Sequence, residues 1–351
     1  MTHVLAAGDH FVTAPLLIDE VTRQVGAQSA LTFSELTLPW PLTPFGRVDS
    51  VDEASGTVDD LLAVLPGVEI AVTQMAPFTR EVFDRNPQLR LVSVCRGGPV
   101  NVDLAAATEA GVLVSYAPAR NAVAAAEFTI GLMIAAMRRI VTSDRELQSG
   151  TWRGDYYTFD NAGIELDGST VGLIGYGAIS RIVARVLLAL GATVITFDPY
   201  ADSESTRADG VTPVTLEDLL RRSSVVSLHA RLTPETRHLL NGTNLSLLPR
   251  GAVLVNGARG GLLDYAPLPA LLRSGQLGAL ALDVYDIEPP PADWPLFDAP
   301  NVVMTPHLAG ASRQTAERAA TIVAVDVARY LGGERPNYLA NPEVWDRLSV
   351  A

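Results

Sequence analysis

The chain has 351 residues, enough for two domains, and 48% hydrophobic against 19% charged residues is typical of a compact soluble protein. Its net charge of −13 would repel nucleic-acid phosphates and anionic membrane surfaces, so we expect neither as a partner. The lone cysteine, Cys95, excludes an internal disulfide, and the N-terminus shows no signal-peptide pattern. We therefore expect a cytoplasmic protein.

The first 117 residues alternate apolar strands with helical patterns. Strands are expected at 4–7, 31–35, 69–73, 91–95 and 112–115, and helices at 16–25, 58–65, 80–86 and 104–110. This alternation predicts a first parallel sheet with helices between its strands.

A domain boundary is expected near residues 117–121. Beyond it, residues 123–141 are rich in Ala, Leu, Ile and Met, and predict one long helix. Residues 152–157 are aromatic-rich and have little periodicity. We expect residues 121–165 to form an arm that contacts a second subunit; the alternative is a loop folded back on its own domain.

A glycine-rich turn follows the apolar strand 171–174 and opens into a helix. Gly175 lets the chain reverse tightly, Gly177 lets the backbone approach a pyrophosphate, and the helix N-terminus offers N–H groups to that anion. The next strand, 193–197, ends in Asp198, where a ribose-binding carboxylate belongs. The pattern predicts a dinucleotide site; an ordinary glycine turn is the alternative.

The alternation resumes after the turn and ends in a last helix. Strands are expected at 225–229, 252–256, 279–283 and 302–305, and the helix at 312–331. If that helix crosses back, the first domain is discontinuous. We expect an α/β fold of two Rossmann-like domains with a ligand cleft between them: a flavodoxin-like substrate domain of residues 1–117 and 311–351, and a dinucleotide-binding domain of residues 118–310.

Three polar residues follow apolar strands of the second half: Arg259, Glu288 and His307. Ligands bind outside the carboxyl ends of the strands in open α/β sheets, so the three side chains are expected to converge. A guanidinium can grip a carboxylate, an imidazole can transfer a proton, and a carboxylate can orient the ring. Beside a nicotinamide, the trio is suited to interconverting a 2-hydroxy acid and a 2-oxo acid.

Each of the three also has an ordinary structural explanation. Arg259 can be a solvated turn residue, Glu288 a loop charge before three prolines, and His307 the cap of the following helix. Only their combination with the glycine turn favours a catalytic role for the three residues.

With these motifs the chain resembles the D-isomer-specific 2-hydroxyacid dehydrogenases, which include D-lactate, D-glycerate and phosphoglycerate dehydrogenases. The likeness runs from about residue 60 to about 335. It is carried by residues 256–264 (NGARGGLLD), 281–289 (ALDVYDIEP), 305–310 (TPHLAG), 226–229, 232–237, 120–121 and 126–128.

The resemblance implies catalytic Arg259, Glu288 and His307, no metal site, and a homodimer formed through the arm. NAD would be held by the glycine turn and Asp198, with Asp283 facing the nicotinamide carboxamide. Further implied cofactor contacts are Gly175, Gly177, Ala178, Ile179, Pro199, His229, Ala230, Thr233, Ala258 and Gly310. We expect NAD rather than NADP, because Asp198 should repel a 2′-phosphate and no arginine stands beside it.

Two positions depart from the family pattern. Ser180 replaces the third glycine of the turn but is small enough for close packing. In the substrate loop, backbone N–H groups near Gly97 and Gly98 would hold the substrate carboxylate, and Arg96 adds a positive charge. That charge favours a second anionic group on the substrate; an arginine pointing to solvent is the alternative.

The chain ends soon after the last helix of the family pattern, so we expect no C-terminal regulatory domain of the kind found in long phosphoglycerate dehydrogenases. Two other functions stay open on the same fold: an NAD-sensing binding protein or corepressor, and a phosphite-type dehydrogenase. The L-specific lactate and malate dehydrogenases fit less well, because their glycine turn lies near the N-terminus.

Overall fold

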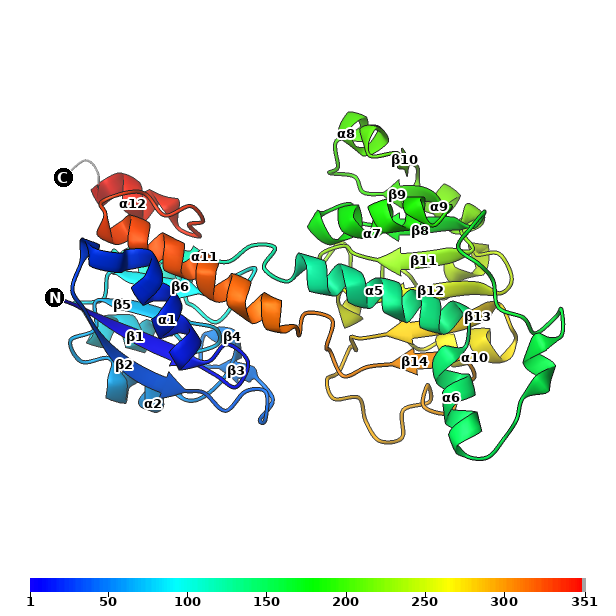
Figure 1. The fold of residues 1–351 in the computed structure, drawn as a ribbon, viewed down its shortest axis with the longest axis horizontal. Helices are drawn as coiled ribbons and strands as arrows, with labels where there is room; N and C mark the ends of the chain where they lie inside the picture. The colour runs from blue at the N-terminus through cyan, green and yellow to red at the C-terminus, as the bar shows by residue number, and fades with distance from the viewer. Residues whose placement is uncertain (349–351) are drawn as a thin grey trace. The chain divides into compact units, whose positions relative to one another are not determined.

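The structure, a computed structural model, describes residues 1–348. It divides into two compact units (Figure 1). Unit 1 comprises Met1–Asn121 and the segment from Ala311 onward, and unit 2 comprises Ala122–Gly310. The division falls at Asn121, within the segment where the sequence predicts a boundary and a few residues after the expected end of the first domain.

The core of unit 1 is a five-stranded parallel sheet in the order β2-β1-β5-β6-β7. Val4 and Ala6 of β1 pack on one side, and Leu5 and Ala7 on the other, because successive side chains of a strand point to opposite faces. Both faces are therefore buried, as a parallel sheet requires. The strands are β1 (Thr2–Gly8), β2 (Leu31–Thr37), β5 (Ile70–Thr73), β6 (Leu91–Val94) and β7 (Leu113–Tyr116).

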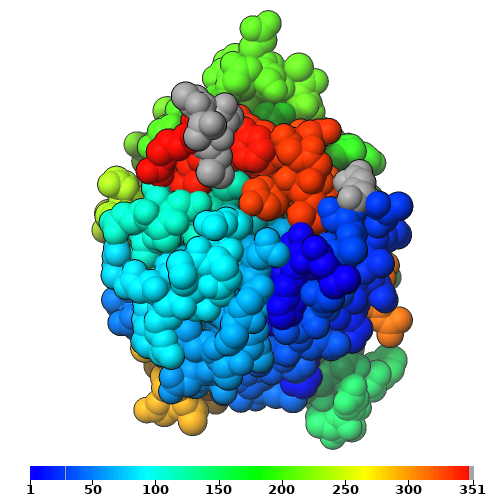
Figure 2. All heavy atoms as spheres, turned by 90° about the vertical axis from the view of Figure 1, so that its left-hand side faces the viewer, coloured from blue at the N-terminus to red at the C-terminus, as the bar shows by residue number. Residues whose placement is uncertain are grey.

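Helices from both ends of the chain cover this sheet. The core cluster on one face contains residues of α1 and the C-terminal helix α11, and the other contains residues of α2, α3 and α4. Figure 2 shows the orange and red C-terminal segment lying against the blue and cyan N-terminal part of unit 1. The helices are α1 (Ala14–Val25), the 3-10 helix η1 (Gly26–Gln28), α2 (Val58–Val64), α3 (Arg80–Arg85), α4 (Leu104–Glu109), α11 (Arg313–Leu331) and α12 (Pro342–Leu348).

Hydrogen bonds tie the C-terminal segment to unit 1. Asn341 accepts from the Val114 amide (2.9 Å) and donates to the Val112 carbonyl (2.9 Å), so it pairs with the backbone beside β7. The helix α12 and the antiparallel hairpin of β3 (Gly46–Val48) and β4 (Val51–Ala54) are not evident from the sequence pattern.

Unit 2 is built on a seven-stranded sheet in the order β10-β9-β8-β11-β12-β13-β14, and all its pairs are parallel. The strand order reverses between β8 and β11, which is where a doubly wound sheet binds its ligand. The strands are β8 (Thr170–Ile174), β9 (Thr193–Phe197), β10 (Thr212–Pro213), β11 (Val225–Leu228), β12 (Ala252–Asn256), β13 (Leu277–Leu282) and β14 (Val302–Met304). The helices are α5 (Ala122–Met137), α6 (Ile140–Gln148), α7 (Ala178–Ala189), α8 (Ser203–Ala208), α9 (Leu216–Arg222) and α10 (Leu268–Arg273), with 3-10 helices η2 (Gly154–Tyr157), η3 (Leu245–Leu247) and η4 (Gly260–Leu262).

The prediction of one helix over residues 123–141 is wrong. The structure has two helices, α5 and α6, separated at Arg138 and Arg139, and Arg139 adopts a left-handed conformation with φ of +54°. The apolar helix α5 packs on α7, β12 and β13, whereas α6 has no buried residue. The chain thus leaves the core where two charged side chains replace the apolar ones.

No helix within residues 1–348 combines the length and the apolar character needed to cross a membrane.

Candidate functional site

The glycine turn after β8 leaves no room for a larger residue at Gly175. Its φ is +96°, and a Cβ there would lie 2.7 Å from the amide nitrogen of Ala230 and 2.8 Å from the carbonyl carbon of His229. Gly175 therefore allows β8 and β11 to approach closely at the point where the strand order reverses.

The N-terminus of α7 is open to an anion. Its capping residue, Gly177, has no side chain to bond the first amides, and a Cβ there would meet no atom within 4 Å. The amides of Ala178 and Ile179 donate to no acceptor within residues 1–348. Open space and unpaired N–H groups fit the pyrophosphate of a dinucleotide.

Gly175→Ala and Gly177→Ala separate the two parts of this turn. Gly175→Ala should abolish dinucleotide binding and also lower Tm, because its Cβ collides with backbone and its φ is strained. Gly177→Ala should weaken binding with little change in Tm, because its Cβ enters open space. Calorimetry and thermal unfolding measure the two effects. Equal Tm values for the two variants would contradict this account of the turn.

Asp198 ties the strand β9 to the glycine turn. Its Oδ2 accepts from the Tyr176 amide (2.7 Å) and its Oδ1 from the Tyr200 amide (2.8 Å). The carboxylate is half-buried and Pro199 beside it is exposed. Asp198 thus stands next to the turn, where it can reach a ribose.

The middle residue of the turn, Tyr176, has a supporting network that the sequence pattern did not reveal. Its hydroxyl donates to Asp209 (3.0 Å), and the guanidinium of Arg181 lies 4.8 Å from the ring centroid and pairs with the same carboxylate. Ser180, which replaces the third glycine, is fully buried and donates to the Gly177 carbonyl (3.1 Å).

The other expected cofactor contacts follow β11, β12 and β14. The half-buried His229 ring bonds to Ser227 (3.0 Å), and burial lowers the pKa of His229 to about 4, so the ring is neutral at pH 7. The Ala258 amide donates to Asn256 (3.1 Å). Ala230 and Thr233 follow β11, and Gly310 follows β14.

Asp283 follows β13 and is directed into the protein. It is 0% exposed. Its Oδ1 accepts from the Thr305 hydroxyl (2.6 Å) and the Leu308 amide (2.7 Å), and its Oδ2 accepts from the Ala309 amide (2.8 Å). Its hydrogen bonds therefore fix the segment after β14.

That segment carries His307, which contacts Glu288 directly. His307 Nδ1 lies 2.8 Å from Glu288 Oε2, and Glu288 Oε1 accepts from the Tyr285 amide (3.0 Å). Burial raises the pKa of Glu288, but the His307 hydrogen bond and charge, the Tyr285 amide and the Arg259 charge together hold it below its usual value. The carboxylate is thus ionised at neutral pH and holds the Nδ1 edge of the ring.

Arg259 follows β12, the strand that pairs with β13 in the sheet. Its carbonyl accepts from the buried Asn256 side chain (3.0 Å), which also accepts from the Ala258 amide and so braces the loop. The guanidinium is exposed, and its charge acts on Glu288. The three residues follow adjacent strands β12, β13 and β14, so they gather at one edge of the sheet. The bracing role of Asn256 was not evident from the sequence.

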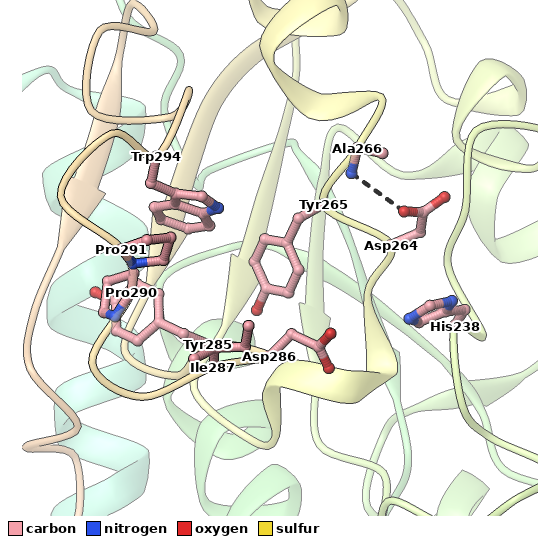
Figure 3. Close-up of a pocket in the computed structure, with 10 residues that line it drawn as sticks. All are labelled: His238, Asp264, Tyr265, Ala266, Tyr285, Asp286, Ile287, Pro290, Pro291 and Trp294. Atoms are coloured by element: carbon pink, nitrogen blue, oxygen red, sulfur yellow. Dashed lines mark hydrogen bonds between the residues drawn. The ribbon is translucent and has the colours of Figure 1, made fainter.

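A hollow borders the loop that carries Glu288 (Figure 3). In Figure 3 the ring of Tyr265 lies between Trp294 on one side and Asp264 and His238 on the other. The loop residues Tyr285 and Asp286 also line it, but Arg259, Glu288 and His307 do not. The hollow is therefore beside the trio rather than part of it.

The glycine pair of the expected substrate loop lies in unit 1, after β6. A Cβ at Gly97 or Gly98 would meet nothing within 4 Å, and neither amide donates a hydrogen bond in the described part of the chain. Arg96 neither points to solvent nor offers a free charge, because its guanidinium pairs with Glu53 and donates to the Glu53 carbonyl (2.9 Å). Only the tertiary fold brings this pair together, since Glu53 stands on β4.

The sequence profile of the D-isomer specific 2-hydroxyacid dehydrogenase family, NAD binding domain, matches residues 130–309. A glyoxylate reductase from Korarchaeum cryptofilum is 37% identical over 268 residues, which cover 76% of this chain and 81% of the relative. A D-3-phosphoglycerate dehydrogenase from Methanocaldococcus jannaschii is 38% identical over 84% of this chain but only 56% of its own length. The chain thus spans about half the length of the D-3-phosphoglycerate dehydrogenases it matches.

Among solved structures, the TT0316 protein from Thermus thermophilus superposes with a TM-score of 0.78 at 32% identity, covering 97% of this chain and all of that one. The glycine turn, the uncapped N-terminus of α7 and Asp198 fall within the matched NAD-binding domain, so the cofactor is NAD(H). The chain belongs to the D-isomer specific 2-hydroxyacid dehydrogenase family.

Proposed function

We propose that the protein is an NAD-dependent dehydrogenase that interconverts a D-2-hydroxy acid and its 2-oxo acid. The observation that carries this proposal is the 2.8 Å contact between His307 Nδ1 and Glu288 at the carboxyl edge of the NAD-binding sheet. Glu288 occupies one ring nitrogen, and Nε2 has no hydrogen-bond partner within residues 1–348. The imidazole is thus held with a free nitrogen for proton transfer.

Each residue of the trio has a distinct role in the proposed reaction. Protonated His307 donates from Nε2 to the carbonyl oxygen during reduction and accepts the proton back during oxidation. Glu288 is a positioning residue, since it orients the ring and favours its charged form. Bound NADH supplies the hydride. Arg259 binds the substrate carboxylate and polarises the carbonyl.

The amides of Gly97 and Gly98 in unit 1 are proposed to bind a carboxylate. They are unpaired and face open space, and backbone N–H groups stabilise anions without a charged side chain. Because Arg96 is paired with Glu53, we assign it the task of fixing this loop to the β3–β4 hairpin.

Loss of NADH absorbance with a panel of 2-oxo acids tests the activity. Glyoxylate, pyruvate, hydroxypyruvate, phenylpyruvate, oxaloacetate and 3-phosphohydroxypyruvate cover the main side-chain types. Turnover of at least one, giving the D-isomer of the product, is expected. Tight NADH binding without any turnover would instead favour an NAD sensor, and NADH formation from phosphite would favour a phosphite dehydrogenase.

Asp198 is proposed to select NADH over NADPH, since its carboxylate repels a 2′-phosphate. Asp198→Asn keeps an acceptor for the Tyr176 or Tyr200 amide and removes the charge. The ratio of kcat/KM values for NADH and NADPH should fall about tenfold, equal to about 1.4 kcal/mol. Glu204→Gln on α8 removes a charge elsewhere and should leave the ratio unchanged. A wild-type preference for NADPH would refute this role.

We further propose a homodimer that forms through the arm, residues 121–165. The arm exposes large aromatic side chains: Trp152 is 82% exposed, Tyr157 96% and Phe159 95%. With Ile140 and Leu147 of α6 they form an apolar surface of the kind that subunit interfaces cover. The lone cysteine supports a reducing compartment, and we propose the cytoplasm.

The arm can be tested without touching the trio. Tyr157→Ser with Phe159→Ser should convert the dimer to a monomer in size-exclusion chromatography with light scattering. Tyr200→Ser removes an equally exposed aromatic ring outside the arm and should leave the dimer intact. A wild-type monomer, or a dimer that survives the double substitution, would exclude the arm as the interface.

A further inference from the structure

Tyr176, the middle residue of the glycine turn, is anchored in the core of unit 2. Its side chain is 4% exposed and belongs to the core cluster that contains Val183 of α7 and Val194 of β9. Burial raises the pKa of Tyr176 to about 12, and the hydrogen bond and charge of Asp209 add to the rise, so the hydroxyl is protonated at neutral pH. The packed ring therefore holds a hydroxyl donor at a fixed place beside the turn.

Asp209, at the C-terminal end of α8, accepts the hydrogen bond of this hydroxyl. Its Oδ2 lies 3.0 Å from the Tyr176 hydroxyl oxygen and also pairs with the guanidinium of Arg181. That guanidinium lies 4.8 Å from the centroid of the Tyr176 ring, and both of its terminal nitrogens lie 3.4 Å from Ser205 Oγ on α8. Arg181, near the N-terminus of α7, thus contacts the glycine turn and α8 at the same time.

These contacts form a shared network rather than an isolated surface ion pair. The side chains of Arg181 and Asp209 are 39% and 41% exposed, and an ion pair with that exposure contributes little by itself. Here, however, the same carboxylate also holds the buried Tyr176 hydroxyl, and the same guanidinium covers the Tyr176 ring. Loss of either charged group would therefore leave the hydroxyl or the ring without its partner.

The network holds both ends of the loop that carries Asp198. The loop begins after β9, where the Tyr176 amide donates to Asp198 Oδ2 (2.7 Å) and the Tyr200 amide donates to Oδ1 (2.8 Å). It ends at α8, which Arg181 contacts through Ser205. Each carboxylate oxygen keeps a further lone pair for a ribose hydroxyl, and the position of Tyr176 fixes where the carboxylate lies.

A displacement of Tyr176 would also reach the anion site. Gly177 follows directly, and the amides of Ala178 and Ile179 at the N-terminus of α7 come next. The expected ribose acceptor and the expected pyrophosphate amides therefore depend on the placement of one residue. Both are expected to bind the same part of a dinucleotide, its adenosine diphosphate half.

We propose that Tyr176, Arg181 and Asp209, here called the turn clamp, position the glycine turn and Asp198 for the adenosine diphosphate half of the cofactor. The three are positioning residues, because they act through the Tyr176 amide and the loop from Asp198 to α8. The inference rests on the proposed contact of Asp198 with the cofactor, and it does not depend on which substrate the enzyme reduces. The turn clamp should therefore set the affinity for NADH and leave hydride transfer unchanged once NADH is bound.

Binding of ADP-ribose, measured by calorimetry, tests the turn clamp without any turnover. ADP-ribose contains the adenosine and both phosphates but no nicotinamide. Arg181→Met and Asp209→Asn should each weaken its binding about fivefold to tenfold, and Tyr176→Phe, which removes only the hydroxyl, about threefold. The double variant of Arg181→Met and Asp209→Asn should bind about as weakly as the weaker single variant, because both substitutions break the same network.

Arg185→Met is the matched control. Arg185 is an exposed arginine one turn further along α7, so its replacement removes the same charge from the same helix. The affinity for ADP-ribose should stay at the wild-type value. Arg181→Lys keeps the charge that pairs with Asp209 but not the planar group that covers the Tyr176 ring, so it should recover part of the affinity. Equal losses in Arg185→Met and Arg181→Met would reduce the effect to net charge and overturn the proposal.

Reduced nicotinamide riboside, which lacks both phosphates and the adenosine, separates positioning from a general loss of structure. With a 2-oxo acid that the enzyme reduces, Arg181→Met should raise KM for NADH about fivefold to tenfold and leave kcat unchanged. Its kcat/KM for reduced nicotinamide riboside should stay within about twofold of wild type, because that compound has no group for the turn to bind. Equal losses with the two cofactors would contradict the proposal, and if no 2-oxo acid is reduced, calorimetry alone decides.

Failure of the turn clamp and failure of the Asp198 contact are distinguishable. If Asp198→Ala weakens ADP-ribose binding and the clamp variants do not, the turn clamp is wrong and the Asp198 contact stands. If none of these variants changes the affinity, both are wrong. Thermal unfolding verifies that each variant is folded, and Tyr176→Phe, the smallest change, carries the test if Arg181→Met or Asp209→Asn is unstable.

Discussion

Replacement of His307 by asparagine should lower kcat for 2-oxo acid reduction by about 10² to 10⁴-fold, the usual contribution of a positioned proton donor. Asparagine is the informative substitution because His307 has a φ of +55°, a conformation that asparagine tolerates better than alanine does. NADH affinity, measured by calorimetry, should change little. Full activity in the variant would remove His307 from the reaction.

A second histidine of unit 2 provides the control. His238 also has a positive φ, +52°, and lines the hollow of Figure 3, which Arg259, Glu288 and His307 do not line. His238→Asn should therefore retain kcat. If both asparagine variants lose activity equally, the loss reflects backbone conformation rather than proton transfer.

The pH dependence of reduction and oxidation also tests the assignment of His307 as the proton donor. Reduction needs protonated His307, so its rate should fall as pH rises and the imidazolium is lost, and oxidation should show the opposite trend. Glu288→Gln removes the carboxylate that holds the ring, so the rate of reduction should fall across the pH range. A pH profile identical to that of the wild type would show that Glu288 does not act on the ring.

The regular elements of both sheets were largely predictable from the sequence. Apolar runs such as Val171–Ile174 are buried on both faces of a parallel sheet, and turn residues such as Gly175 mark their ends. Because parallel strands share one carboxyl edge, the placement of Arg259, Glu288 and His307 after consecutive strands was enough to predict that they gather.

What the sequence could not provide depends on contacts between distant segments. The pairing of Arg96 with Glu53 links residues 43 apart along the chain, and a pattern shows only the charge of each. Two other differences are local: the strands of the hairpin β3–β4 are too short to show a clear alternation, and the helical pattern continues past Arg138 and Arg139, where the helix breaks. The contacts of Arg181 with Tyr176 and Asp209 also become visible only in the tertiary fold.

The most consequential difference between the sequence-based expectation and the structure concerns the side chain of Asp283. The sequence resemblance assigns Asp283 to the nicotinamide, whereas its carboxylate is 0% exposed and accepts three hydrogen bonds from the segment around His307. The two roles lead to different kinetics. If Asp283 contacts the cofactor, its replacement should lower the affinity for NADH. If Asp283 braces the segment around His307, its replacement should lower kcat.

Asp283→Ala should lower kcat by about 10²-fold, since a misplacement of about 1 Å at the proton donor has that effect. The Leu308 and Ala309 amides and the Thr305 hydroxyl lose their acceptor, so the segment that positions His307 relaxes. The Kd of NADH should change less than threefold, about 0.65 kcal/mol, if bracing is the main role. Stopped-flow NADH binding and steady-state reduction rates measure the two quantities on the same preparation.

Asp286→Asn serves as the matched control, because it removes a partly exposed carboxylate a few residues further along the same loop. It should leave kcat and Kd close to wild type. Asp283→Asn keeps one acceptor oxygen and should fall between wild type and Asp283→Ala in kcat. If Asp283→Ala instead weakens NADH binding and spares kcat, the carboxylate acts on the nicotinamide, and the brace seen between β13 and β14 must open when the cofactor binds.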